Sequence, residues 1–378
     1  MAFGFFKKNR EKRKNTSGQQ NAKSVNSHYY NLKVKEIVQE TQDAISLVFE
    51  MPEPKMQYKS GQFLTLICEI ENKEVRRSYS FSSAPEVDED IAVTIKRVKG
   101  GLMSNYLPDH VKVGDTVRVM EPMGVFTTEF DPNNKRHIIM FAGGSGITPM
   151  MSLIKSTLTR EPESVVSLIY ANRNIDTVIF KEELDKWQTK YEGRLHVIHI
   201  LDEAPMNWQG HSGLLNHEML TRLFERIPDW GEDKTSYLMC GPEGMMINVE
   251  TLLAQQNIAR EKIIKESFVA GTVNKDDKSG EGDSATLKAR TVKIRYQGEE
   301  HVISVQPGKT ILETALDDGI DLPYSCQAGL CTACRGKCLS GKVKLDEEEG
   351  LSSDEREDGY ILTCVGHPLT DDVVIEIG

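Results

Sequence analysis

The sequence predicts a multidomain protein: an antiparallel β-barrel, an α/β domain built on a parallel sheet, and a small α+β domain. Residues 29–132 hold short strand-like runs separated by turn residues, which is typical of a small antiparallel barrel. Residues 133–269 alternate apolar strand-like runs with helix-like runs, which indicates a parallel sheet covered by helices. Residues 287–378 begin with a hairpin-like pair of strands and a capping box, T-I-L-E, that marks a helix start. With 378 residues, each part can have its own core.

Composition narrows the classes of function. Lys and Arg number 46 against 57 Asp and Glu, and the resulting net charge of −11 argues against nucleic-acid binding. No apolar run approaches the length of a membrane span, so we expect no stable membrane association. The seven cysteines are odd in number, and no secretory signal is recognisable. A reducing, cytoplasmic location is therefore expected.

Two segments are predicted to lie outside the folded domains. Residues 1–28 contain a basic run followed by Ser, Gly, Gln and Asn, and are predicted to form a disordered basic leader with no assigned function. The phenylalanines before that run leave contact with an anionic membrane surface as an alternative. Residues 270–286 mix Gly, Ser, Asp and Lys and are predicted to form a flexible linker. Such a linker would let the last domain move between its neighbours and an outside partner.

Two polar stretches of the predicted barrel carry groups that a flavin nucleotide requires. Its ring needs a flat apolar partner and a hydroxyl near atom N5, and its phosphates need cations or N–H donors. The first stretch is R-S-Y-S, and the second is a strand end followed by G-L-M-S, whose serine we expect to cap a helix. Taken alone, R-x-Y-S also fits a half-exposed structural strand. The two stretches supply Arg77, Ser78, Tyr79, Ser80, Lys96, Val98, Gly101, Leu102, Met103 and Ser104.

A glycine-rich turn follows a buried strand-like run at the start of the α/β domain. It reads G-G-S-G-I-T-P, and its proline falls in the first turn of the helix that follows. Glycines let the backbone approach a pyrophosphate, and the helix N-terminus attracts its charge. A second turn, C-G-P, ends a later strand at the same ligand-binding edge. These turns supply Gly143, Gly144, Gly146, Thr148, Pro149, Cys240, Gly241 and Pro242.

Four cysteines near the C-terminal end form the most specific pattern. The spacing C-x4-C-x2-C with a distant fourth cysteine matches the plant-type ligand set of a [2Fe-2S] cluster. Small residues between them let backbone N–H groups approach the sulfides. The alternatives are a four-thiolate zinc site, although structural zinc usually uses two C-x2-4-C pairs, or unrelated core cysteines. The predicted ligands are Cys326, Cys331, Cys334 and Cys364.

In this order, the motifs resemble the ferredoxin-NADP reductase superfamily, joined to a plant-type ferredoxin domain of the β-grasp fold. The resemblance covers everything after the basic leader. It implies an FAD-binding domain at 29–132, an NAD(P)-binding domain at 133–269 and a [2Fe-2S] domain at 287–378. The G-L-M-S turn is more similar to members that use FAD than to those that use FMN. By the same resemblance, Gly101, Met103 and Ser104 would cradle the FAD phosphates.

The resemblance also implies individual roles around the flavin. Arg77 would hold its pyrophosphate, Tyr79 would pack on its ring and Phe268 would cover it. The implied catalytic residues are Ser80 near N5, Cys240 beside the nicotinamide C4, and Glu266. For Cys240 the alternative is a buried cysteine at a strand end. The dinucleotide would be bound by Gly143, Gly144, Gly146 and Thr148.

Arg173 bears on the choice of nucleotide. It lies at the end of the second strand of the α/β domain, where a carboxylate would favour the ribose diol of NAD. An arginine there suits a 2′-phosphate, so we expect NADPH, with NADH as the alternative. A surface arginine without such a role is the alternative for Arg173.

The resemblance implies that electrons pass from NAD(P)H to FAD, to the [2Fe-2S] cluster and then to an external protein acceptor. The domain order is similar to that of the reductase subunit of ring-1,2-phenylacetyl-CoA epoxidase and of other multicomponent oxygenase reductases. This implies a di-iron oxygenase as the acceptor. A fatty-acid desaturase or a hybrid-cluster protein is the alternative acceptor. A hypothesis of another class is a non-catalytic redox sensor or scaffold.

Overall fold

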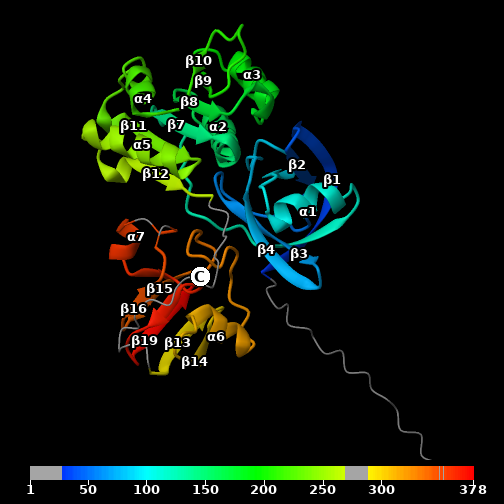
Figure 1. Ribbon diagram of the computed structural model, residues 1–378, viewed down its shortest axis with the longest axis vertical. Coiled ribbons are helices and arrows are strands. Elements are labelled where there is room, and N and C mark those ends of the chain that lie inside the picture. Colours follow the sequence, from blue (N-terminus) through cyan, green and yellow to red (C-terminus); the bar gives the residue numbers. More distant parts are fainter. Residues whose placement is uncertain (1–27, 269–287, 349, 352) are drawn as a thin grey trace, which may run out of the picture.

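The computed structural model describes residues 28–268, 288–348, 350–351 and 353–378, which form three bodies, each with its own main sheet (Figure 1). The predicted linker and the predicted leader, apart from His28, lie outside these residues. The predicted multidomain fold class is confirmed. Among the described residues, no helix has both the length and the apolar character needed to cross a bilayer.

The first body is a six-stranded antiparallel sheet in the order β4-β3-β6-β1-β2-β5. Its strands alternate: Leu32 and Val34 on β1 are buried, whereas Asn31 and Lys33 are exposed. The buried side chains, together with Leu107 of the helix at residues 102–110, form a barrel core. The elements are β1 (Tyr29–Thr41), β2 (Ala44–Phe49), β3 (Phe63–Ile70), β4 (Lys73–Ser80), β5 (Ile91–Lys96), α1 (Leu102–His110) and β6 (Thr116–Met120).

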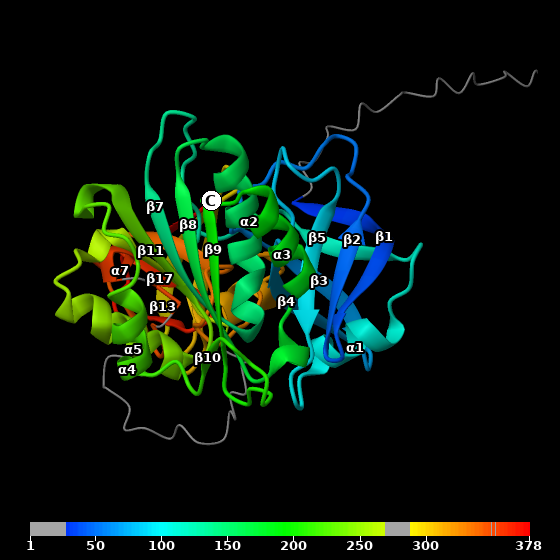
Figure 2. The same cartoon turned by 90° about the horizontal axis from the view of Figure 1, so that it is seen from above.

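The second body is a parallel sheet in the order β10-β9-β8-β7-β11-β12 with helices on both faces. Successive residues of β7 face opposite cores, Met140 with α2 and α3, and Phe141 with α4 and α5. Helix α2 lies between this sheet and the barrel (Figure 2), so residues 147–158 are all buried. The elements are β7 (His137–Gly143), α2 (Ile147–Arg160), β8 (Val165–Asn172), α3 (Lys181–Lys190), β9 (Leu195–Leu201), β10 (His211–Ser212), α4 (His217–Phe224), β11 (Thr235–Cys240), α5 (Glu243–Gln255) and β12 (Ile263–Glu266), with 3-10 turns η1 (Gly144–Gly146), η2 (Ile175–Thr177), η3 (Glu232–Lys234) and η4 (Arg260–Lys262).

The third body is a mixed five-stranded sheet in the order β14-β13-β19-β15-β17, with a separate β16-β18 pair. Helix α6 packs on the sheet through Ile311, Leu312 and Ala315. The predicted capping box is confirmed, because the Thr310 hydroxyl accepts the Glu313 N–H and Glu313 accepts the Thr310 N–H. The elements are β13 (Arg290–Tyr296), β14 (Glu299–Val305), α6 (Ile311–Asp317), β15 (Arg335–Ser340), β16 (Val343–Leu345), α7 (Ser353–Glu357), β17 (Tyr360–Leu362), β18 (Gly366–Pro368) and β19 (Val373–Ile377).

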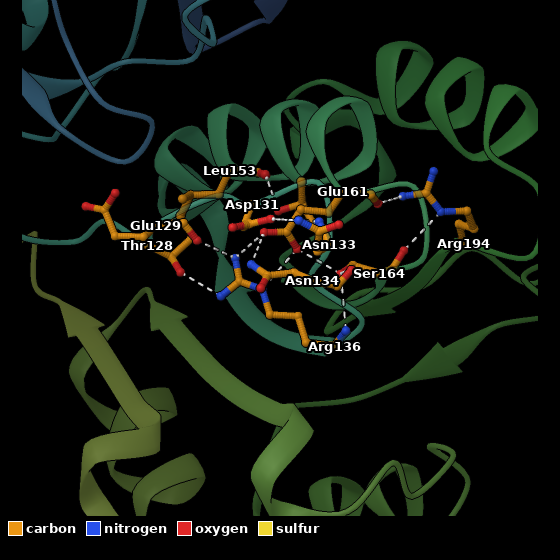
Figure 3. A network of polar contacts seen from close by, with 11 residues as sticks. Thr128, Glu129, Asp131, Asn133, Asn134, Arg136, Leu153, Glu161, Ser164 and Arg194 are labelled. Atoms are coloured by element: carbon orange, nitrogen blue, oxygen red, sulfur yellow. Dashed lines mark hydrogen bonds and ion pairs between the residues drawn. The ribbon is translucent and has the colours of Figure 1, made fainter.

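A buried ion pair anchors the segment that joins the barrel to the parallel sheet. Figure 3 shows Arg136, just before β7, donating to both carboxylate oxygens of Glu161, at 2.8 and 3.0 Å. Arg136 also donates to the Thr128 hydroxyl and the Glu129 carbonyl of the joining segment. Because Glu161 is completely buried, these partners are needed to offset its loss of hydration. The network lies at the amino ends of the strands, so it leaves their carboxyl ends open for ligands.

Candidate functional site

A cavity of about 1110 Å³ lies where the three bodies meet. It is larger than the roughly 300–1,000 Å³ of usual small-molecule sites. Each body contributes to its wall: β4 and the turn before α1 from the barrel, β12 and its continuation from the parallel-sheet body, and a cysteine loop from the third body. The predicted residues that line it are Arg77, Ser78, Tyr79, Ser80, Lys96, Val98, Gly101, Leu102, Met103, Ser104, Thr148, Glu266, Phe268, Cys326 and Cys331.

The other predicted residues lie behind this wall or apart from it. The glycine turn and the C-G-P turn pack against each other behind Thr148, and two of the four cysteines are buried inside the third body. Arg173 lies on the surface. The residues outside the lining are Gly143, Gly144, Gly146, Pro149, Arg173, Cys240, Gly241, Pro242, Cys334 and Cys364.

Strand β4 presents polar side chains to the cavity along the edge of the barrel sheet. It is the end strand of that sheet, so its outer backbone groups are not used by the β-ladder and are available to a ligand. Tyr79 packs beside the barrel core while still lining the cavity, which suits a ring that stacks on an apolar partner. The Arg77 guanidinium lines the same wall and donates to the Arg76 carbonyl at 2.7 Å.

The turn before α1 differs from the prediction in one respect. Ser104 does not cap the helix: the N-cap is Gly101, and Ser104 lies inside α1. The Ser104 hydroxyl instead accepts the Val98 N–H at 3.2 Å, which folds the turn back on its strand. A Cβ at Gly101 would come within 2.4 Å of that hydroxyl, so any larger residue there would displace the Ser104 side chain from Val98. Since no side chain caps α1, its first N–H groups are left to a ligand such as a phosphate.

The glycine turn and the C-G-P turn pack backbone to backbone. Parallel pairing of β7 and β11 brings them together, with Cys240 opposite Ala142. A Cβ at Gly146 would lie 2.0 Å from the Cys240 carbonyl oxygen, and one at Gly241 would lie 2.9 Å from the Gly143 nitrogen. The start of α2 therefore opens directly onto these two turns. Such a cradle of backbone N–H groups suits a pyrophosphate.

The three predicted catalytic residues come from two bodies and lie close together. Cys240 and Glu266 are register partners on the parallel strands β11 and β12. The Ser80 hydroxyl of the barrel donates to Glu266 Oε2 at 3.3 Å. Burial raises the pKa of Glu266 to about 8, and burial followed by the nearby Glu266 charge raises the pKa of the Cys240 thiol. A carboxyl group with such a pKa can take up or release a proton near neutral pH.

The sulfur atoms of the four cysteines lie together, with two close pairs, and the Cys364 thiol also contacts Cys326. The Cys326 and Cys331 sulfurs are 3.2 Å apart, and so are those of Cys334 and Cys364. A tetrahedral metal with bonds of about 2.3 Å holds its thiolates roughly 3.7 Å apart, so each pair fits one metal. Four thiolates grouped with two close pairs fit a two-metal cluster with two thiolates on each metal.

Backbone N–H groups support the thiolate at the start of this loop. The Ala328 N–H lies 3.4 Å from the Cys326 sulfur. Hydrogen bonds from the Cys331 and Cys364 thiols, and then from the backbone of Ala328 and Leu330, lower the pKa of Cys326 despite its burial. The positive φ of Gly329, +73°, lets the loop turn tightly enough to present these groups.

Two partners of the site were missed by sequence reasoning. Arg173 is 72% exposed and donates to Glu203 at 3.0 Å, so the cation expected at a 2′-phosphate already has a carboxylate partner. Glu203 comes just after β9, the strand that pairs with β8, so its position in the sequence could have predicted that it lies near Arg173. Ser78 donates to Ser325 of the third body at 2.9 Å. These two serines are 247 positions apart and share no local sequence pattern, so their contact could not be predicted from the sequence.

Three protein families match successive parts of the chain. Residues 31–128 match an oxidoreductase FAD-binding domain, residues 140–251 an oxidoreductase NAD-binding domain, and residues 294–369 a 2Fe-2S iron-sulfur cluster binding domain. The order is that of the barrel, the parallel-sheet body and the third body.

Relatives with known names cover nearly the whole chain. One component of the 1,2-phenylacetyl-CoA epoxidase of Escherichia coli K12 is 33% identical over 92% of this chain and 97% of its own length. The ferredoxin reductase component of the 3-ketosteroid-9-alpha-monooxygenase of Rhodococcus rhodochrous is 37% identical over 91% of this chain and 96% of its own length. The structure of phthalate dioxygenase reductase shares the fold, with a TM-score of 0.56 at 22% identity, over 92% of this chain and 98% of its own.

Proposed function

We propose that this chain passes electrons from NADPH to the di-iron oxygenase of a phenylacetyl-CoA epoxidase-type monooxygenase. The chain belongs to the ferredoxin-NADP reductase superfamily and is an oxidoreductase of the kind that serves multicomponent oxygenases. It carries FAD-binding, NAD-binding and [2Fe-2S] domains. The observation that supports the electron path is the cavity lined by residues of all three bodies. The cysteine usage of the chain favours a cytoplasmic location.

In this proposal each part of the wall has its own task. FAD and the cluster, when bound, supply the conversion of a two-electron hydride into single electrons. The edge of β4 and the first turn of α1 bind and orient the flavin, and the two packed turns bind the dinucleotide. Glu266 can hold a proton in the cavity wall beside Ser80, whose hydroxyl donates to Glu266 Oε2. The proposed domains are residues 29–132, 133–269 and 287–378, and the cysteine pairs of the last domain hold the irons.

The proposed acceptor follows from the domain order and from the relative that belongs to a phenylacetyl-CoA epoxidase. The ketosteroid relative favours a second candidate, in which the same electron path ends at a ketosteroid-type oxygenase. Mixing the reduced protein with the oxygenase of each class and following cluster reoxidation separates the two. We expect a rate about tenfold or more higher with the epoxidase oxygenase, and the reverse order assigns the second candidate.

An anaerobic titration of the purified protein with NADPH tests the electron path. We expect bleaching of flavin absorption followed by the electron paramagnetic resonance signal of one reduced [2Fe-2S] centre. A protein without flavin, or a flavin that bleaches while the cluster never follows, contradicts the path. Either result leaves a redox sensor or scaffold as the function.

Cys331→Ser tests whether flavin and cluster act in series. We expect the variant to lose nearly all reduction of cytochrome c and to keep most reduction of ferricyanide, because ferricyanide can take electrons from the flavin. Cys338→Ser is the matched control: Cys338 lies in the same domain outside the two sulfur pairs and donates to the Ser340 carbonyl. Equal loss of both activities in Cys331→Ser rules out the serial path.

The NADPH preference is tested at Arg173 and its partner. Charge-assisted hydrogen bonds contribute about 1.5–3 kcal/mol, so Arg173→Ala should raise KM for NADPH about tenfold and leave KM for NADH nearly unchanged. Glu203→Gln frees the guanidinium and should lower KM for NADPH about twofold, as the loss of an exposed ion pair allows. Steady-state assays with both nucleotides measure these effects. Parallel changes for NADPH and NADH would remove the proposed role of Arg173.

A further inference from the structure

A buried arginine joins the barrel to the loop that leads into the cluster cysteines. Arg76 of β4 is only 6% exposed. Its Nη2 lies 3.3 Å from Asp321 Oδ1 of the third body, and its guanidinium carbon lies 4.2 Å from the centre of the Tyr324 ring. Within the barrel, Glu74 holds the same Nη2 at 2.7 Å. A planar cation that is stacked and ion-paired in this way is positioned more rigidly than a lysine would be.

Three further hydrogen bonds lie around this arginine. The Tyr29 hydroxyl on β1 donates to Asp321 Oδ2 at 2.5 Å, and Arg76 Nη1 donates to that hydroxyl oxygen at 3.3 Å. Burial, and then the hydrogen bond to Asp321, raises the pKa of Tyr29 to about 12, so the hydroxyl keeps its proton in the physiological range. The Ser78 hydroxyl donates to Ser325 at 2.9 Å. The contacts that leave the barrel, to Asp321, Tyr324 and Ser325, all fall on residues 321–325, immediately before the first cluster cysteine.

The contacts form a series along one face of β4. Alternate residues of a strand share a face and are spaced about 6.8 Å apart, so Arg76, Ser78 and Ser80 form one row. The first contacts Asp321 and Tyr324, the second contacts Ser325, and the third contacts Glu266 in the cavity. One strand therefore sets the distance between the cysteine loop and the wall that carries Ser80.

We propose that Arg76 is a positioning residue that docks the [2Fe-2S] domain on the barrel, with Cys326 and Cys331 turned towards the flavin side of the cavity. The inference rests on the proposed function, because it concerns the arrangement in which the cluster receives electrons. Arg76 takes no part in the hydride or redox steps. Its effect is on geometry, since it holds the barrel and the third body, which are far apart in the chain, in one mutual position.

The test compares Arg76→Gln, Arg76→Lys and Asp321→Asn with the wild-type holoprotein. Asp321→Asn removes the same contact from the half-exposed partner, so it keeps the test open if Arg76→Gln folds poorly. Lys33→Gln is the matched control, because Lys33 pairs with Glu50 within the barrel. Anaerobic stopped-flow mixing with NADPH separates flavin reduction from cluster reduction. Hydrogen exchange of residues 321–325 in the oxidised protein reports docking without turnover.

We expect flavin reduction to stay within about twofold of wild type in every variant. A misplacement of about 1 Å can cost a reacting pair about a hundredfold in rate, so cluster reduction should slow about tenfold or more in Arg76→Gln and Asp321→Asn. Arg76→Lys should recover part of this loss, because it keeps the charge but not the stacked fork. Exchange of residues 321–325 should accelerate about tenfold, which corresponds to a loss of about 1.4 kcal/mol in docking. The control should change neither quantity.

The outcomes separate this inference from the function on which it rests. A wild-type cluster that NADPH never reduces overturns the proposed function and this inference together. The inference alone is overturned if NADPH reduces the wild-type cluster and both Arg76→Gln and Asp321→Asn match wild type in the rate of cluster reduction and in the exchange of residues 321–325. Slower flavin reduction in step with slower cluster reduction also overturns it, because Arg76 would then serve the flavin wall. Unchanged midpoint potentials of flavin and cluster in the variants confirm that geometry, not driving force, has changed.

Discussion

Glu266 is a carboxyl group that keeps its proton at neutral pH because of its surroundings. Burial raises its pKa from 4.5 to about 8, and the hydrogen bond from Ser80 offsets only part of that rise. The folded protein therefore binds this proton more tightly than the unfolded chain does. Between about pH 4.5 and 8 the folded state carries the proton and the unfolded state does not, so stability falls as the pH rises. Above about pH 8 the full cost of the buried charge is present.

Glu266→Gln should remove this pH-dependent cost. Each unit of pKa difference corresponds to about 1.4 kcal/mol, and because Glu266 faces the cavity we expect only about 2 kcal/mol of the full linkage. The stability of the variant relative to wild type should be greater at about pH 8.5 than at about pH 6. The measurement is the melting temperature of the variant minus that of wild type, taken at each pH. Glu225→Gln, an exposed glutamate at the end of α4, is the control. A difference that is the same at both pH values would show that Glu266 titrates normally.

At this scale the sequence predicted the residues that lie in local motifs and missed those that meet across domains. Ser80, Cys240 and Glu266 were predicted to act together, and the structure brings them together. Arg76 and Asp321 were not predicted, because they are 245 positions apart and neither belongs to a motif. A contact of this kind depends on how finished domains pack, and that packing leaves no periodic pattern in the chain.

At the scale of elements, close packing of the two nucleotide-side turns depends on a missing side chain. Gly146 has φ of −61°, so its backbone conformation is open to any residue, and the requirement for glycine is one of space. Gly146→Ala would place a Cβ 2.0 Å from the Cys240 carbonyl oxygen, which has no flexible group to move aside. We expect a loss of about 2 kcal/mol or more in stability and weaker binding of the dinucleotide. Thermal unfolding and nucleotide titration measure the two effects.

Gly244→Ala is the matched control for this substitution. Gly244 lies in the first turn of α5, and a Cβ there would meet no atom within 4 Å among the described residues. Alanine is the better helix former by about 1 kcal/mol, so this variant should be neutral or slightly more stable. If Gly146→Ala melted at the wild-type temperature and bound nucleotide normally, the direct contact of the two turns would not matter for the site.

The elements themselves were well predicted because their periodicities are local. The antiparallel strands expected within residues 29–132 and the capping box of α6 both appear in the structure. Ser104 was the exception: its window holds both a glycine and a serine, and either residue suits an N-cap. The fold of the turn, in which the serine accepts the Val98 N–H, decides between them. That hydrogen bond spans six positions and has no signature in sequence.

At the scale of the whole molecule, the three bodies were predicted but not how tightly each pair is joined. The barrel and the parallel-sheet body share a core, because Ala44 and Phe126 of the first pack in one cluster with Met150 of α2. Buried polar contacts reinforce this seam: Ser152 donates to the Ser83 carbonyl at 2.6 Å, and Lys155 pairs with Asp88 at 3.2 Å. The third body has a separate apolar core drawn only from residues 292–377.

This difference predicts where the chain can be divided. A fragment ending at residue 268 keeps both partners of the shared core, so it should fold, bind FAD and reduce ferricyanide with NADPH at nearly the wild-type rate. It should lose reduction of cytochrome c, because the four cysteines are absent. A fragment ending at residue 132 would instead expose the barrel surface that α2 covers, an apolar patch that favours aggregation. Gel filtration, flavin content and the two activity assays measure the outcome. If the shorter fragment gave a soluble barrel that contains FAD, the shared core would not be needed for folding. The contact of the barrel with α2 would then be dispensable for folding, as we expect the smaller, mainly polar contact at Arg76 to be.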